Sequence, residues 1–176
     1  MASNSTNTRR RTADDTLHIS DLPIGFLVDV SAYLAKPSRA ILAVAFSAPS
    51  TSWKNDNLMH QPSPISTAIV SASQWDTLNF EDIERVEDVE RELAHKLLDD
   101  DIYAILKCIS AHDVLKKLQL AGCIDIIGHG LNPLQNSAVL ELIDISIVGK
   151  YETPYNRTEP KISEEAVLPI LDSIVH

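Results

Sequence analysis

The sequence has few of the residues that build common catalytic and metal sites. It contains only five glycines, and no Gly-rich phosphate loop, HExxH zinc motif or Cys-x-x-Cys pair occurs. Its two cysteines, Cys108 and Cys123, follow an N-terminus that lacks a secretory signal, so we expect buried thiols in a reducing compartment. The acidic run 99–101 lacks the spacing of a calcium loop and suits the N-terminus of a helix. We therefore expect a cytoplasmic or nuclear chain that is not an enzyme and holds no cofactor or metal.

Positive charge and long apolar runs are also scarce. Lysine and arginine number 15 against 25 aspartates and glutamates, which gives a net charge of −10. Such a surface repels phosphate backbones and anionic lipids, so nucleic-acid and membrane binding are not expected. No apolar run approaches the roughly 18 residues that a membrane span requires. Apolar residues still make up 44% of the chain, enough for a core, so we expect its partners to be proteins.

The N-terminal third predicts two short helices. Residues 1–15 are rich in Asn, Ser, Thr and Arg and are expected to be a disordered tail. From Leu22 to Leu34, apolar residues recur at steps of three and four, which predicts a helix with one apolar face. Pro37 is expected to end this helix and Ser38 to cap a second one, which is apolar almost all round. Two short helices cannot bury so much surface alone, so the hairpin should dock on the rest of the chain or on another protein.

The spacing of this segment is similar to that of a known module. Leu22-Pro23 is followed ten residues later by Tyr33-Leu34, then by a helix of small apolar residues and by Trp53. This arrangement resembles an F-box, a short helical module that binds a Skp-type adaptor of a cullin ubiquitin ligase. The resemblance implies a module over residues 16–54 and a linker over 55–74. The adaptor-binding residues that it implies are Leu22, Pro23, Leu27, Val30, Tyr33, Leu34, Leu42, Val44 and Trp53.

The second half of the chain repeats a pattern. Leu115, Leu118 and Leu120 occupy positions 1, 4 and 6 of a short segment, and Cys123 follows three residues later. The same apolar spacing occurs 25 residues later over 140–145 and 40 residues earlier over 75–80. Each copy predicts a short strand whose three apolar residues point inward, and such strands bury themselves only by stacking in parallel. The pattern resembles the cysteine-containing class of leucine-rich repeat.

A second set of apolar positions accompanies the strands. Ile102 and Ile105 align with Leu131 and Leu134, and again with the pair Val167 and Ile170. These positions predict a return helix in each repeat, and residues 81–98 predict an extra helix in the first. The expected fold class is therefore α/β, a helical hairpin followed over 75–176 by a small leucine-rich-repeat-like solenoid with two or three parallel strands. No polar cap follows the last repeat, which favours a piece of a longer array or an edge that another surface covers.

Two functions fit these patterns. In the first, the chain is a non-catalytic substrate receptor that binds a Skp-type adaptor and its cullin through the hairpin and an unknown protein target through the concave face. The residues expected on that face are Lys116, Lys117, Gln119, Glu141 and Asp144. In the alternative, the repeats bind a protein unconnected to ubiquitin, and the hairpin caps the first strand edge. Apolar hairpin side chains that turn inward onto the repeats favour the cap, and exposed ones favour the adaptor.

Overall fold

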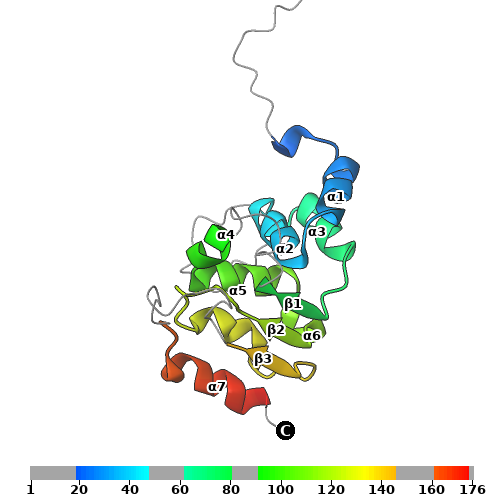
Figure 1. Cartoon of the computed structure of the whole chain (residues 1–176). Coiled ribbons are helices and arrows are strands. Elements are labelled where there is room, and N and C mark those ends of the chain that lie inside the picture. Colours follow the sequence, from blue (N-terminus) through cyan, green and yellow to red (C-terminus); the bar gives the residue numbers. More distant parts are fainter. Residues whose placement is uncertain (1–18, 48–61, 81–90, 146–160, 175–176) are drawn as a thin grey trace, which may run out of the picture.

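The computed structural model describes residues 19–47, 62–80, 91–145 and 161–174. Within these ranges the chain combines helices with a three-stranded parallel sheet in the order β1-β2-β3 (Figure 1). The mixed α/β class and the parallel sheet agree with the sequence-based prediction. In chain order the elements are η1 (Ile19–Asp21), α1 (Ile24–Ala32), α2 (Lys36–Ala45), α3 (Pro64–Ser71), β1 (Thr77–Asn79), α4 (Arg91–Lys96), α5 (Asp99–Cys108), α6 (Ala111–Val114), β2 (Lys117–Gln119), η3 (His129–Leu134), β3 (Leu142–Asp144) and α7 (Glu164–Ile174).

The strands pair in the register that the sequence shifts predict. Leu78 lies opposite Leu118 across β1 and β2, and Leu118 lies opposite Ile143 across β2 and β3. These pairs are 40 and 25 residues apart, as the repeated apolar pattern requires. Leu78 and Leu118 are fully buried, because parallel strands that carry a helical layer on one face must bury that face.

Helices α5, η3 and α7 follow the three strands in the same order, and η3 packs between the other two. The aligned helical positions all lie in the core, where they meet the inward side chains of the strands. These buried residues are Ile102, Ile105, Leu131, Leu134, Val167 and Ile170. The structure therefore contains three successive units of strand and helix. The prediction for residues 81–98 lies partly outside the described residues, and within them α4 forms over Arg91–Lys96.

The third strand is less buried than its pattern predicts. Ile143 is half-buried, and Ile145, expected to point inward, is 37% exposed. The equivalent residues of the first two units, Phe80 and Leu120, are fully buried. β1 and β3 are both edge strands, but α2 packs on β1, whereas no described element packs as closely on the free side of β3, so the inward side chains of β3 have fewer neighbours.

Within the described residues, the N-terminal helical unit contains three α-helices where the sequence pattern predicts two. Residues 64–71 fall in the segment predicted to be a linker, but they form α3, which packs on both α1 and α2. The boundary between α1 and α2 also differs from the prediction. Helix α2 begins at Lys36, so Pro37 lies in its first turn, where a missing N–H is harmless, and Ser38 is not its N-cap.

The three-helix unit is continuous with the sheet unit. Helix α2 packs on β1 and α5, and its Ala40 belongs to the same core cluster as Leu78 and Ile105. Small residues allow this close approach, because Ala40 and Ala43 are both fully buried. Figure 1 shows α1 at one end of the molecule and α7 at the other. Helix α2 therefore covers the side of the first strand–helix unit that faces away from β2.

Candidate protein-interaction surfaces

Helix α1 has two apolar faces, whereas the sequence pattern predicts one. On one side Leu27, which is 2% exposed, and Ser31 are buried. On the other side a row of apolar residues is exposed to solvent, spaced by three or four positions along the helix. This row, which we call the α1 stripe, consists of Pro23, Phe26, Val30 and Tyr33. The apolar residues from Leu22 to Leu34 cover so wide an arc of the helix surface that the neighbouring helices bury only part of it.

The α1 stripe is an open apolar surface on a helix that is otherwise packed. Phe26 is 53% exposed and Tyr33 is 91% exposed. Val30 lies one turn from each of them and is also exposed. Scattered apolar residues on a surface are ordinary, but a contiguous row on one helix face is a candidate interaction site.

The residues predicted to bind the adaptor therefore divide into groups. Pro23, Val30 and Tyr33 are exposed on the stripe, and the structure adds Phe26 to them. Leu27 is a core residue of the helical unit, which leaves no surface for a partner. Trp53 lies outside the described residues. The remaining predicted residues are half-buried: Leu22, Leu34, Leu42 and Val44, the last of which packs against the central core.

The position of α1 is fixed by Arg39 of α2. The Arg39 guanidinium donates from Nε to the carbonyl oxygen of Ser31 at 2.8 Å, and from one terminal nitrogen to those of Ala32 at 2.9 Å and Leu34 at 3.1 Å. Its other terminal nitrogen donates to the Ser73 hydroxyl, just after α3. A cation at the C-terminus of a helix satisfies carbonyls that have no partner within the helix. Arg39 thus ties all three N-terminal helices together and presents the stripe in one orientation.

The second candidate surface is the outer face of the sheet. Here Lys116, Lys117 and Glu141 are exposed, and Gln119 and Asp144 are half-buried. Lys116 Nζ lies 3.9 Å from Glu141 Oε1, an exposed pair that contributes little stability. Leu142 adds an exposed apolar side chain beside Lys117 in the register. Of the five residues predicted to bind a target, Lys117 and Gln119 lie on β2 and Asp144 lies on β3, whereas Lys116 and Glu141 immediately precede these strands.

At the β1 end of this face, the Lys36 ammonium of α2 lies 2.8 Å from the Asp76 carboxylate and 3.1 Å from the Thr77 hydroxyl. The hydrogen bond and the charge of Lys36 lower the pKa of Asp76 below its ordinary value. This contact joins the helical unit to the beginning of β1.

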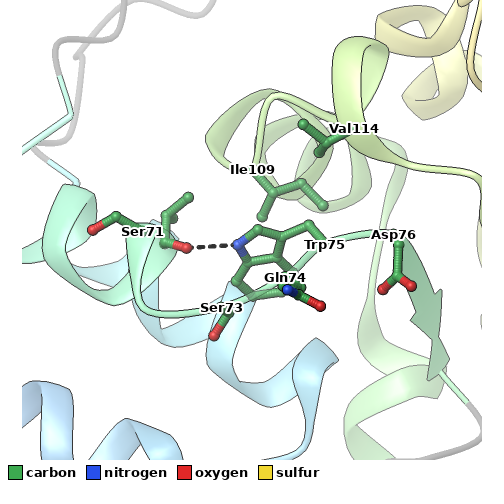
Figure 2. A pocket seen from close by; sticks show the side chains of 8 residues that line it. Ser71, Ser73, Gln74, Trp75, Asp76, Ile109 and Val114 are labelled. Atoms are coloured by element: carbon green, nitrogen blue, oxygen red, sulfur yellow. Dashed lines mark hydrogen bonds between the residues drawn. The ribbon is translucent and has the colours of Figure 1, made fainter.

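A depression with a volume of about 450 Å³ lies beside this end of the sheet, between α3, the segment that leads into β1, and the residues that follow α5, including α6 (Figure 2). Its apolar walls come from Val70, Trp75, Ile109 and Val114. The Trp75 indole N–H donates to the Val70 carbonyl oxygen at 2.8 Å, so the ring has no polar group left to satisfy. The sequence pattern assigned Trp75 to a strand core, and it is indeed nearly buried.

A turn that could be mistaken for a catalytic site is structural. The Asp99 carboxylate accepts hydrogen bonds from the backbone N–H groups of Ile127, Gly128 and Gly130 at 2.6, 2.9 and 2.6 Å. Gly128 has a φ of +121°, and a Cβ on Gly130 would lie 2.5 Å from the Asp99 carbonyl oxygen. Both glycines are thus required by the backbone, and the exposed His129 between them only follows the turn. Asp101 accepts from the Leu98 N–H at 2.9 Å and caps α5, as expected for an acidic residue at a helix N-terminus.

The surroundings of the two cysteines do not indicate a reactive thiol. Burial raises the pKa of Cys123 to about 12, so its thiol stays protonated and unreactive. Cys108 is half-buried and its sulfur lies 3.4 Å from the Ser66 hydroxyl of α3. Among the described residues no group of three or more His, Cys, Asp and Glu side chains is placed to hold a metal. None of the described helices has the length and apolar character to cross a bilayer.

Comparisons with protein-family models, with curated proteins and with solved structures find no match for this chain. Its function must therefore be inferred from the two surfaces themselves.

Proposed function

We propose that this chain is a non-catalytic substrate receptor of a cullin-type ubiquitin ligase. Its N-terminal helices resemble an F-box and would bind a Skp-type adaptor, and its strand–helix units, which resemble leucine-rich repeats, would bind the target. The mechanism is proximity: a target held on the sheet unit experiences a high effective concentration of the conjugating enzyme that the adaptor and cullin recruit.

The observation that carries this proposal is that α2 is packed into the core whereas α1 leaves an apolar row exposed. Helix α2 buries Ala40 in the central core, so its position serves the fold. The stripe on α1 contributes nothing to that core, yet it exposes Phe26, Val30 and Tyr33 together. An adaptor that covers these three side chains would remove a large apolar area from water, at about 25 cal/mol for each Å².

Binding of a purified Skp-type adaptor tests the proposal directly. Calorimetry should show binding by the wild-type chain, and the double substitution Val30→Asp with Tyr33→Asp should weaken it by at least about 30-fold, because interface anchors contribute about 2 kcal/mol or more. Leu168→Asp is the control, since Leu168 is an apolar residue on α7 that is 50% exposed, against 41% for Val30, and it lies far along the chain from the stripe. Leu27→Asp is a poor test because Leu27 is buried and its loss would unfold the helical unit.

The results separate three cases. Failure of the wild type to bind any Skp-type adaptor refutes the ligase proposal. Binding that the double variant and the control retain equally shows that the stripe is not the contact. Co-precipitation of a cullin from cell extract by the wild type and the control, and its loss with the double variant, supports the whole assembly.

A second function is favoured by the packing of α2. Because α2 lies on β1 and α5, it covers the first strand–helix unit as a cap would. In this alternative the chain is a leucine-rich-repeat-like interaction module with no link to ubiquitin. The same adaptor titration decides between the two, because a cap alone gives no reason for the α1 stripe to bind an adaptor.

A further inference from the structure

The sheet has an open strand edge at β3, on the side away from the N-terminal helices (Figure 1). The Leu142 N–H donates to the Lys116 carbonyl oxygen at 3.0 Å, and the Asp144 carbonyl oxygen accepts from the Leu120 N–H at 3.0 Å. Leu142 and Asp144 therefore bond toward β2. Backbone groups of a strand point alternately to its two sides, so those of Ile143 point away from β2. No described residue bonds to them there, which leaves one donor and one acceptor on the free edge.

The inward side chains beside this edge are apolar and only partly covered. Ile143 is half-buried against the core, and Ile145 is 37% exposed. Leu118 and Leu120, which hold the equivalent positions in the second unit, are fully buried. A further strand would supply the missing cover, because each strand of the stack buries the inward side chains of its neighbour. The edge therefore suits an extended chain with apolar residues at alternate positions.

The last two units are negatively charged even when every lysine in them is counted. From Lys116 to the end of α7, the described residues carry three lysines and six carboxylates, a net charge of −3. Residues 146–160 carry two basic and two acidic residues, so their sequence leaves the sum unchanged. Asp144 already takes part in another interaction, so the argument uses this sum and no free carboxylate. A second copy of the chain is repelled by such a charge, whereas a basic segment is attracted.

We propose that the free edge of β3 binds an extended segment of a partner protein as a fourth strand, and that this segment alternates apolar residues with lysine or arginine. Two apolar residues would lie beside Ile143 and Ile145, and the basic residue between them would lie beside Asp144. This pattern reads the same from both ends, so it fits a parallel or an antiparallel strand. Backbone bonds to Ile143 supply affinity, and the alternation supplies selectivity. The inference goes beyond the proposed function and requires no adaptor.

Amide hydrogen exchange, measured by NMR on the isotope-labelled full-length chain, tests the edge directly. In the free chain the Ile143 amide should exchange faster than the Leu142 amide, which already bonds to β2. The probe is the end-blocked peptide Thr-Arg-Ile-Lys-Ile-Arg-Thr. Its binding should slow exchange at Ile143 by about tenfold or more, and far more than at Leu142. A peptide with glutamate in place of each basic residue, and one of the same composition with its two isoleucines adjacent, are the controls and should not bind.

Methyl groups on the backbone nitrogens of the probe show whether it binds as a strand. Every second N–H group of a strand faces the same neighbour. Methylation at alternate positions should therefore weaken binding by about tenfold, whereas methylation at the positions between them should have much less effect. This series uses the wild-type chain, so no folding defect can imitate the result.

A substitution at the edge provides a second test. Ile145→Lys should weaken binding of the probe by about tenfold or more, because it removes an apolar contact and adds a charge of the same sign as the probe. Phe26→Lys is the control, since Phe26 is 53% exposed on α1, at the other end of the molecule (Figure 1), and should bind the probe as the wild type does.

An Ile143 amide as protected as that of Leu142 in the free chain would overturn the inference, because the edge would then already be covered. No binding at about 1 mM probe, equal binding of the acidic peptide, or equal effects of methylation at every position would also overturn it. So would loss of binding in Phe26→Lys instead of Ile145→Lys, or a dimer in sedimentation that Ile145→Lys dissociates. Adaptor binding is measured separately, so its failure defeats the ligase proposal alone, and failure of the probe defeats this site alone.

Discussion

Replacing Asp99 by alanine should destabilise the fold far more than replacing its neighbour Asp100. The Asp99 carboxylate is the acceptor for three backbone N–H groups of the next unit, at distances of 2.6 to 2.9 Å. Two of these donors, on Gly128 and Gly130, belong to buried residues. Gly130 lies so close to the Asp99 backbone that water has little room to replace the lost oxygens.

The expected magnitude follows from the two buried donors. A hydrogen bond to a charged group contributes about 1.5–3 kcal/mol, and a buried donor without a partner costs about 1–3 kcal/mol. Asp99 is half-buried, and its bonds share one carboxylate, so we expect a loss of about 2–4 kcal/mol for Asp99→Ala rather than the full sum. With a urea slope of about 2 kcal/mol per molar, the midpoint should fall by about 1–2 M.

Urea unfolding followed by far-ultraviolet circular dichroism measures this difference. Asp100→Ala is the control, because Asp100 occupies the same first turn of α5 and is exposed. It removes the same favourable charge at the helix N-terminus, about 0.3–1 kcal/mol, without touching the glycine turn. Asp99→Asn, which keeps one acceptor oxygen, should fall between the two. Equal midpoints for Asp99→Ala and Asp100→Ala would refute the role of the carboxylate.

Three further predictions concern the core and its charges. Leu118→Ala should lower the free energy of unfolding, measured in urea, by about 2–5 kcal/mol. Leu142→Ala, on the exposed face of the next strand, should lower it by less than about 0.5 kcal/mol. Similar urea midpoints for the two variants would contradict the register. A thiol reagent at about pH 8 should leave Cys123 unmodified in the folded chain and modify it in urea, read by peptide mass. The folded pKa of Cys123 is about 12 against an ordinary 9.0, so its contribution to stability falls as the pH rises from 9.0 toward 12. Lys36 lowers the pKa of Asp76 below 3.8, so the pair stabilises the fold above that pH and loses this effect below it. Lys36→Met should therefore lose less thermal stability than the wild type between about pH 5 and about pH 2.5, and an equal loss would count against the pair.

The strand register was predictable because it depends on a repeated local pattern. The spacing of Leu115, Leu118 and Leu120 predicts a short strand with these residues inward. Because the same spacing recurs elsewhere in the chain, the distance between copies predicts which residues pair across neighbouring strands. The return-helix positions were predictable for the same reason, since Leu131 and Val167 fill equivalent places in successive units. Strand and helix positions can be read from local periodicity, because burial of one face of an element sets the spacing of its apolar residues.

Helix α3 was missed although the sequence contains its start signal. Ser63 and Pro64 are the N-cap and first residue of a helix, and the Ser63 hydroxyl accepts a hydrogen bond from the Ser66 N–H at 3.1 Å. The same pair also begins many turns, and the surrounding Ser, Pro and Asn residues favoured that interpretation. Burial of Ser66 and Ile69 against α1, α2 and α5 decides the matter, and no local pattern encodes those contacts.

The candidate surfaces were only partly predictable. Side chains alternate along a strand, so Lys117 and Gln119 of β2 point away from the buried Leu118, as the sequence pattern predicts. That these residues bind a target stays a prediction. The two faces of α1 do not follow from its sequence, because Leu27 and Val30 are equally apolar and only the position of α3 decides which is buried. The depression depends on Val70 of α3, Val114 of α6 and Trp75, which precedes β1, and no local sequence pattern brings these three together.

The contacts between the helical unit and the sheet unit bear on how the two surfaces would work together. Lys36 to Asp76 and Ser66 to Cys108 each join the helical unit to the sheet unit. They surround a continuous apolar core that includes Ala40 and Leu78, so α1 and the outer sheet face are held in one orientation. A flexible connection would spread a bound target over a large volume, and its effective concentration near a second site would fall as the connection lengthened. A rigid connection instead fixes the direction in which the target points from the adaptor surface. If α1 binds an adaptor, the core around Ala40 therefore sets which target lysines can reach the conjugating enzyme.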